Sequence, residues 1–306
     1  MHNQDYTYIA EQNLAIDNET GEVLKTISAV FPVGSRIETP KQQQRNKELR
    51  ERQKQQEIRK MLYRNNNPKF TFIQAEHHYK DINPENVGRL MFLSTYLGYD
   101  SNVLLMTQKT ELHKKDLPNL MNLSNTTFLR FWNDVNGKYL TENADGYVCI
   151  TNDFFARGRL TKIHTEWQKL YVGAMRNLYH MLPTSGHRYI GFLFQMLPFV
   201  NIEYNILCHN PYETDIEKII PLTLSEFCLA CGYKTAEQRA RLIKKYSHIQ
   251  FDIDGHKELF CSFVTNLANI DDSKIYINPN VLYKGSKWDE VKILGQFCKV
   301  ITTKTD

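Results

Sequence analysis

Two segments far apart in the chain, Tyr147–Gly158 and Lys274–Gly285, follow the same pattern. Each begins with a β-rich run, crosses a short polar stretch that contains Asn, adds two apolar residues and stops at a basic residue followed by Gly. The same order of elements is predicted before each segment: an apolar helix, a short helix, a turn, a second helix with polar and basic residues, and then strands. This repeated order indicates two copies of one structural unit.

The order is typical of a winged helix-turn-helix, which inserts one helix into the major groove of DNA. We therefore predict an α+β, mainly helical fold with two tandem winged helix-turn-helix domains and a basic N-terminal helical arm. The expected organisation is an N-terminal β element at 1–36, a basic helical arm or linker at 37–69, a first winged helix at 70–160, a connector helix at 161–186 and a second winged helix at 187–306.

Composition limits the class of protein. A chain of 306 residues suggests about two domains of roughly 100–200 residues each, and its 42% hydrophobic content can supply sizeable cores. No run approaches the roughly eighteen apolar residues of a membrane helix, and the first residues lack the layout of a signal peptide. We therefore expect a cytoplasmic protein without membrane contact, in which the six cysteines are reduced thiols.

Positive charge is concentrated near the N-terminus. Residues 41–69 contain ten Lys or Arg against three Glu, a local excess larger than the net charge of +4 of the whole chain. A helix is predicted over 41–64, and such a helix can neutralise DNA phosphates. The alternatives are a solvated linker or a helix that packs on a dimer partner. The candidate phosphate contacts are Arg45, Arg50, Arg52, Lys54, Arg59 and Lys60.

The second helix of each winged-helix domain is the expected DNA-reading element, because hydrogen-bonding side chains at its start can reach base edges. In the first winged helix it spans Asn125–Val135 and follows the N-cap Ser124. It is expected to bury Phe128, Leu129, Trp132 and Val135. Its candidate DNA contacts are Asn125, Thr126, Thr127 and Arg130. In the second winged helix it spans Thr235–Tyr246, with Leu242 and Ile243 facing inward. Its candidate contacts are Lys234, Thr235, Gln238, Arg239, Arg241, Lys244 and Lys245.

The second winged helix is expected to read DNA better than the first, because Arg and Lys pair well with guanine edges and phosphates. Glu142 and Asp145 make the first wing acidic, which favours dimerisation over DNA binding for the first winged helix. A connector helix is predicted over Thr161–Met181, a wing hairpin around Asp254–Gly255, and a short docking helix over Trp288–Val300.

Metal and enzyme chemistry find little support. Four residues could be zinc ligands: Cys208, His209, Cys228 and Cys231. However, Cys228 and Cys231 are expected inside a short helix, where Cys behaves as a small apolar residue. His77 and His78 are adjacent in an extended segment and so point to opposite faces. No phosphate-binding Gly-rich loop ending in Lys-Ser/Thr is present in the sequence. We predict no metal, no cofactor and no catalytic residues; a nuclease is the remaining enzyme alternative.

The segments Ile16–Val23 and Ile277–Gly285 resemble parts of the RepL family, the replication initiators of small Gram-positive plasmids, and related phage proteins. The resemblance covers about the first thirty and the last hundred residues, and it implies sequence-specific DNA binding in plasmid or phage biology. We therefore expect a double-stranded DNA-binding replication initiator or transcription regulator that forms a homodimer. The alternative is an interaction protein that binds a polymerase, a helicase, a host defence factor or another replication or transcription protein.

Overall fold

The computed structural model describes residues 6–9, 14–18, 20–24, 40–63, 69–107, 109–160, 167–253, 255–264, 273–285 and 298. Contacts between Cα atoms divide the chain into two compact units, Met1–Gln56 and Glu57–Asp306. The predicted domain boundaries are finer than this division and remain predictions.

The predicted fold class is wrong. The structure is 40% helical and 25% strand, with several antiparallel sheets, so it is a mixed α/β structure and not mainly helical. The strand content was underestimated because several strands have only two to five residues. Strands this short carry little periodicity in the sequence.

The first unit holds a three-stranded antiparallel sheet of β1 (Tyr6–Ile9), β2 (Leu14–Asp17) and β3 (Val23–Leu24). Strand β2 continues to Asp17, into the stretch predicted as a turn, and Gly21 then closes the turn with a φ of +71°. Helix α1 (Pro40–Tyr63) crosses the boundary between the units and matches the predicted basic helix. Pro40 is tolerated because it stands in the first turn, where its missing N–H is not needed.

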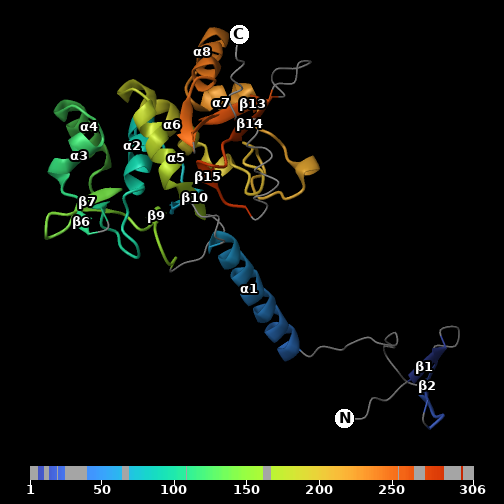
Figure 1. The fold of residues 1–306 in the computed structure, drawn as a ribbon. Coiled ribbons are helices and arrows are strands. Elements are labelled where there is room, and N and C mark those ends of the chain that lie inside the picture. The colour runs from blue at the N-terminus through green and yellow to red at the C-terminus, as the bar shows by residue number, and fades with distance from the viewer. Residues whose placement is uncertain are drawn as a thin grey trace. The chain divides into compact units, whose positions relative to one another are not determined.

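The second unit consists of two halves that repeat the same order of elements (Figure 1). The first half contains β4 (Phe70–Gln74), α2 (Pro84–Ser94), β5 (Leu105–Thr107), β6 (Thr110–Glu111), η1 (Lys114–Asp116), α3 (Leu117–Leu120), α4 (Asn125–Val135), β7 (Leu140–Glu142), β8 (Val148–Ile150) and β9 (Phe155–Ala156).

The second half contains β10 (Trp167–Tyr171), α5 (Val172–Met181), η2 (Thr184–Gly186), α6 (His187–Gln195), η3 (Leu197–Phe199), η4 (Ile216–Lys218), α7 (Leu224–Ala230), α8 (Ala236–Tyr246), β11 (Gln250–Ile253), β12 (His256–Leu259), β13 (Cys261–Val264), β14 (Lys274–Ile277) and β15 (Leu282–Tyr283). Helix α5 and the β11–β12 hairpin have no counterpart among the described elements of the first half.

The halves share one four-stranded sheet with the order β15-β10-β4-β9. Each half supplies a central strand and the edge strand that pairs with it, since β9 pairs with β4 and β15 with β10. The pairs Phe72–Ala156 and Lys169–Tyr283 hold the same place in the two halves. Phe72 and Lys169 also face each other across the centre of the sheet, so an approximate two-fold axis passes through this pair.

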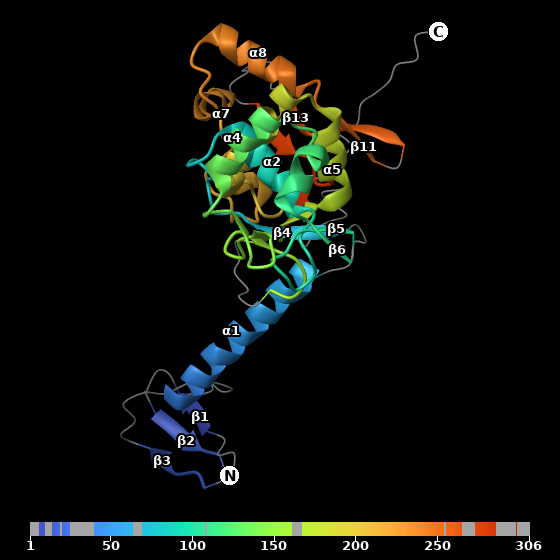
Figure 2. The ribbon, with the colours of Figure 1, turned by 90° about the vertical axis from the view of Figure 1, so that its left-hand side faces the viewer.

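Two glycines allow the equivalent helices α2 and α6 to approach closely. Helix α2 packs against α6, and Figures 1 and 2 show α2 inside this unit. A Cβ atom on Gly88 would collide with the carbonyl oxygen of His187, and one on Gly191 with that of Pro84. His187 and Pro84 each begin their own helix, so the two contacts are related by the approximate two-fold axis. One hydrophobic cluster then runs through both halves, from Ile73 to Tyr283.

The repeated segments of the sequence have the same role in both halves. Strands β8 and β14 contain the β-rich runs of the two segments. After a turn, each segment continues into an edge strand of the shared sheet, β9 or β15. The terminal Gly158 lies against the Asp100 side chain, and Gly285 lies against Glu203 and the backbone of Ile202. The Gly that ends each segment is therefore required by close packing where the chain leaves the sheet.

The predicted connector helix is partly wrong. Trp167–Tyr171 is the central strand β10, and the helix begins only at Val172. All five residues of β10 are buried, including Gln168 and Lys169, so both faces of this central strand are covered. Trp167, Leu170 and Tyr171 have a spacing that also fits one face of a helix, so periodicity alone misassigned them. Residues 161–166, Asp254 and the predicted helix at 288–300 lie outside the described residues, apart from Cys298.

Candidate nucleic-acid interface

Helix α8 begins at a well-formed N-terminus. The Thr235 hydroxyl accepts a hydrogen bond from the Gln238 N–H at 3.2 Å, and Gln238 Oε1 accepts from the N–H groups of Thr235 and Lys234 at 3.2 and 2.9 Å. This reciprocal capping satisfies N–H groups that a helix otherwise leaves unpaired. The predicted contacts Thr235 and Gln238 are thus exposed but already serve the cap, and Lys234 is exposed beside them.

The outer face of α8 is cationic. Leu242 and Tyr246 are fully buried and fix the helix, and the Tyr246 hydroxyl donates a hydrogen bond to the Tyr189 carbonyl at 2.6 Å. Arg241, Lys244 and Lys245 are exposed on the remaining surface. Arg241 forms an exposed ion pair with Glu237 one turn earlier, which costs little to break because such pairs contribute little stability. A face of this kind can meet phosphates or base edges.

Arg239 has a different role from the one expected of it. Its side chain is half-buried and donates a hydrogen bond from NH1 to the Ser225 hydroxyl at 3.0 Å. Ser225 belongs to α7, so Arg239 ties α8 to the helix before it. A substitution at Arg239 would therefore disturb packing as well as surface charge.

Helix α4 stands in the first half where α8 stands in the second. Ser124 caps it, accepting a hydrogen bond from the Thr127 N–H at 3.3 Å, and the side chains of Phe128, Trp132 and Val135 are buried as predicted. Asn125, Thr126 and Arg130 are exposed, whereas Thr127 is half-buried with its hydroxyl 2.9 Å from that of Ser124. Both helices lie at the periphery of their unit in Figure 1.

Leu129 departs from the prediction. It was assigned to the buried stripe of α4 but is 53% exposed, next to Arg130 on the outer surface. The error arises because Leu129 follows Phe128 directly, and adjacent helical residues are turned by about 100° from each other. A groove of about 760 Å³, lined in part by Pro118, Phe128 and Leu129, runs beside it.

The hairpin of β7 and β8 carries both acidic residues of the predicted first wing. Glu142 and Asp145 are exposed, and Glu142 lies 3.8 Å from the ammonium group of Lys114. That ammonium group also lies 4.6 Å from the centre of the Trp132 ring. The hairpin surface is therefore not strongly attractive to phosphate.

The basic helix α1 exposes the predicted side chains whose positions are described, which are Arg45, Arg50 and Arg52. The side chains of Lys54, Arg59 and Lys60 lie outside the described ones. Phosphate contact by this helix remains a prediction.

The four possible zinc ligands Cys208, His209, Cys228 and Cys231 do not converge on one point. All six cysteines are free and buried, and the Cys231 thiol has its pKa raised by burial. His209 lies 3.3 Å from Glu226, not in a cluster with Cys208, Cys228 and Cys231. Within the described part of the chain, no three His, Cys, Asp or Glu side chains converge as metal ligands would. None of the described helices combines the length and the apolar character needed to cross a bilayer.

No family model, curated protein or solved structure matches the chain. The resemblance to RepL proteins therefore stays a prediction from short sequence segments.

Proposed function

We propose that this chain binds double-stranded DNA sequence-specifically and acts as a replication initiator or transcription regulator of a phage or plasmid. The observation that carries the proposal is the outer face of α8, where Arg241, Lys244 and Lys245 are exposed while Leu242 and Tyr246 anchor the helix. Helices that follow a shorter helix across a turn are commonly inserted into the major groove. The second copy of this arrangement, around α4, supports a binding mode with two contacts on one duplex.

The experiment uses the double variant Lys244→Gln/Lys245→Gln, because neither lysine has an ion pair among the described residues. Binding to duplex fragments from the locus of the gene is measured by fluorescence anisotropy at several salt concentrations. We expect at least roughly tenfold weaker binding and a salt slope smaller by about one to two, one for each lost phosphate contact.

The control is Lys80→Gln, which removes an exposed lysine far along the chain from α8. It should leave both the affinity and the salt slope unchanged. Weak binding that is equal for every fragment and insensitive to the α8 substitutions would contradict specific DNA recognition by this helix.

A second candidate function is supported by Leu129. An apolar side chain that is 53% exposed, in a groove that it lines together with Pro118 and Phe128 and with charged residues of both signs, suits a protein partner better than a phosphate backbone. In this case the first half would bind a polymerase, a helicase or a second copy of the chain. A stoichiometric partner that survives nuclease treatment and is lost on Leu129→Glu, but retained by Lys244→Gln/Lys245→Gln, would favour this function.

A further inference from the structure

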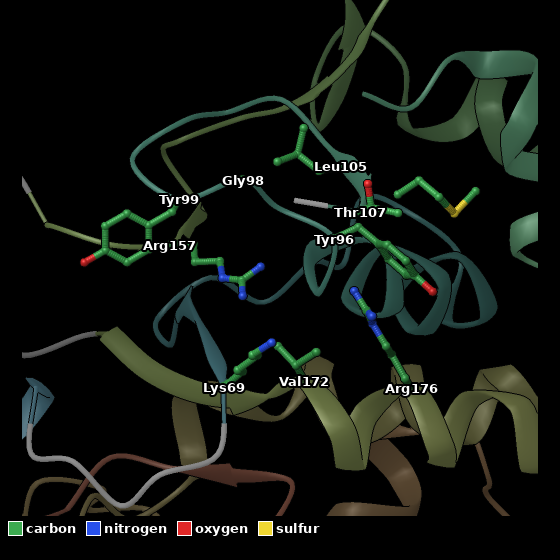
Figure 3. A pocket seen from close by; sticks show the side chains of 10 residues that line it. Lys69, Tyr96, Gly98, Tyr99, Leu105, Thr107, Arg157, Val172 and Arg176 are labelled. Carbon is green, nitrogen blue, oxygen red and sulfur yellow. The ribbon is translucent and has the colours of Figure 1, made fainter. Parts of the chain in front are cut away.

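A cavity of about 520 Å³ opens in the second unit between elements of both halves, outside both α4 and α8. Its lining includes three cationic side chains from three separate elements: Lys69 beside β4, Arg157 after β9 and Arg176 on α5. Figure 3 shows these side chains around a common space, with Tyr96 and Thr107 at its border. None of the lining residues is acidic. We call this cavity the cationic pocket.

The two guanidinium groups are held in place by the protein. Arg176 donates hydrogen bonds to the hydroxyl and the carbonyl oxygen of Thr95 at 2.9 and 2.8 Å, and it stacks on the Tyr96 ring at 3.6 Å. Arg157 donates from NH1 to the Leu97 carbonyl at 2.8 Å. A guanidinium has five N–H donors, so each group keeps donors beyond those that orient it.

No carboxylate among the described residues balances these charges. Neither arginine nor Lys69 forms an ion pair within the described part of the chain. Asp100 lies near Arg157 in space, since its N–H donates a hydrogen bond to the Arg157 carbonyl at 2.8 Å, but the carboxylate Oδ1 of Asp100 accepts a hydrogen bond from the Arg159 N–H at 2.6 Å. Burial lowers the pKa of both guanidinium groups, and for Arg176 the charge of Arg157 lowers it further. An anion would relieve both effects.

The fold does not require this cavity, because the place related to it by the approximate two-fold axis is nearly closed. At that place, Ala75, Ile202 and Lys284 correspond to Val172, Tyr99 and Arg157 of the cationic pocket. There, Tyr212 lies over Lys284, with the ammonium group 5.5 Å from the ring centre, and the remaining cavity has only about 10 Å³. The open volume and the paired arginines therefore occur at one of the two related places and not at the other.

We propose that the cationic pocket binds a small phosphate-bearing ligand such as a nucleotide. Arginine matches phosphate oxygens with two parallel N–H groups, and Lys69 adds a third positive charge at the entrance. A cavity of about 520 Å³ is within the range of small-molecule sites. The site is separate from the proposed DNA contact on α8.

The test is isothermal titration calorimetry on the full chain, without DNA, using inorganic pyrophosphate and ATP as probes. We expect saturable binding to one site, weakened about tenfold or more by Lys69→Gln and by Arg157→Gln. Lys69→Gln is the safer variant, because its side chain is exposed and has no hydrogen bond with any described residue. Arg159→Gln is the matched control, since Arg159 is exposed two residues from Arg157 and does not line the pocket.

Two results would overturn the proposal. One is the absence of saturable binding by either probe to the wild-type chain. The other is equal weakening by Arg159→Gln, which would indicate attraction by general surface charge. If the probes fail to bind while Lys69→Gln and Arg157→Gln weaken duplex binding, the phosphate belongs to the DNA backbone and the small-ligand proposal is wrong.

Discussion

His187 lies where α2 and α6 cross, with its ring stacked on Tyr179 at 3.9 Å between centroids. Its side chain is almost completely buried, and this burial, together with the nearby charge of Arg89, lowers its pKa from 6.5 to about 4. Between these two pH values the unfolded chain binds a proton at His187 and the folded chain does not. The native state therefore loses stability as the pH falls from about 6.5 toward 4.

We predict that His187→Phe removes this part of the pH dependence, because phenylalanine keeps a flat ring in the stack but cannot be protonated. The full effect at His187 is about 3 kcal/mol, of which about 2 kcal/mol falls between pH 7 and pH 5. Urea unfolding at pH 7 and pH 5 measures it as the difference between wild-type and variant, which cancels the contributions of the other histidines. An identical loss of stability in both proteins would contradict the assignment to His187.

At this scale the sequence predicted residue types better than residue roles. Asn125, Thr126, Arg130, Arg241, Lys244 and Lys245 are exposed as predicted. Leu129 was wrongly assigned to the buried face, because it is turned by about 100° from its neighbour Phe128. Arg239 is only partly exposed because it donates a hydrogen bond to Ser225, and its contact with DNA remains a prediction. Arg157 and Arg176 were missed, since they converge from β9 and α5 and no local pattern joins them.

The crossing of α2 and α6 makes a prediction for whole elements. Gly191→Ala should destabilise the protein by about 1–3 kcal/mol or more, because its Cβ would collide with the backbone carbonyl of Pro84 and the helices would have to separate. Gly173→Ala is the matched control in α5, where nothing lies within 4 Å of an added Cβ. It should be neutral or stabilising by up to about 1 kcal/mol.

Chemical denaturation measures both variants. If Gly191→Ala is as stable as Gly173→Ala, the close helix crossing does not exist as described.

Elements with clear local signals were predictable. Helix α4 has the predicted bounds, and α1 lies within one residue of its predicted ends, because a cap, a proline and helix-forming residues mark them. The shared sheet was not predictable, because β9 and β15 have two residues each and owe their pairing to strands far away in the chain. Strand β10 was mistaken for a helix because it is buried on both faces, so its sequence shows no alternation of apolar and polar residues.

For the whole molecule, the shared sheet and the common hydrophobic cluster predict that both halves of the second unit unfold together. Native-state hydrogen exchange should give the same opening free energy for the amides of α2 and α6. Gly191→Ala should lower both by the same amount, although the substitution lies in the second half. Loss of protection in α6 alone would mean that the halves are independent domains.

The two-fold repeat also bears on the proposed function, since it presents α4 and α8 from equivalent positions of one rigid core. If both helices contact DNA, one chain recognises two neighbouring stretches of duplex. If α4 binds a protein instead, one chain joins that partner to the DNA held by α8.

A DNase footprint on duplex DNA from the locus of the gene tests the central claim most directly. Our account predicts a discrete protected segment with the wild-type chain and its loss, at the same protein concentration, with Lys244→Gln/Lys245→Gln but not with Lys80→Gln. Absence of any discrete protection, or an unchanged footprint with the α8 variant, would contradict it.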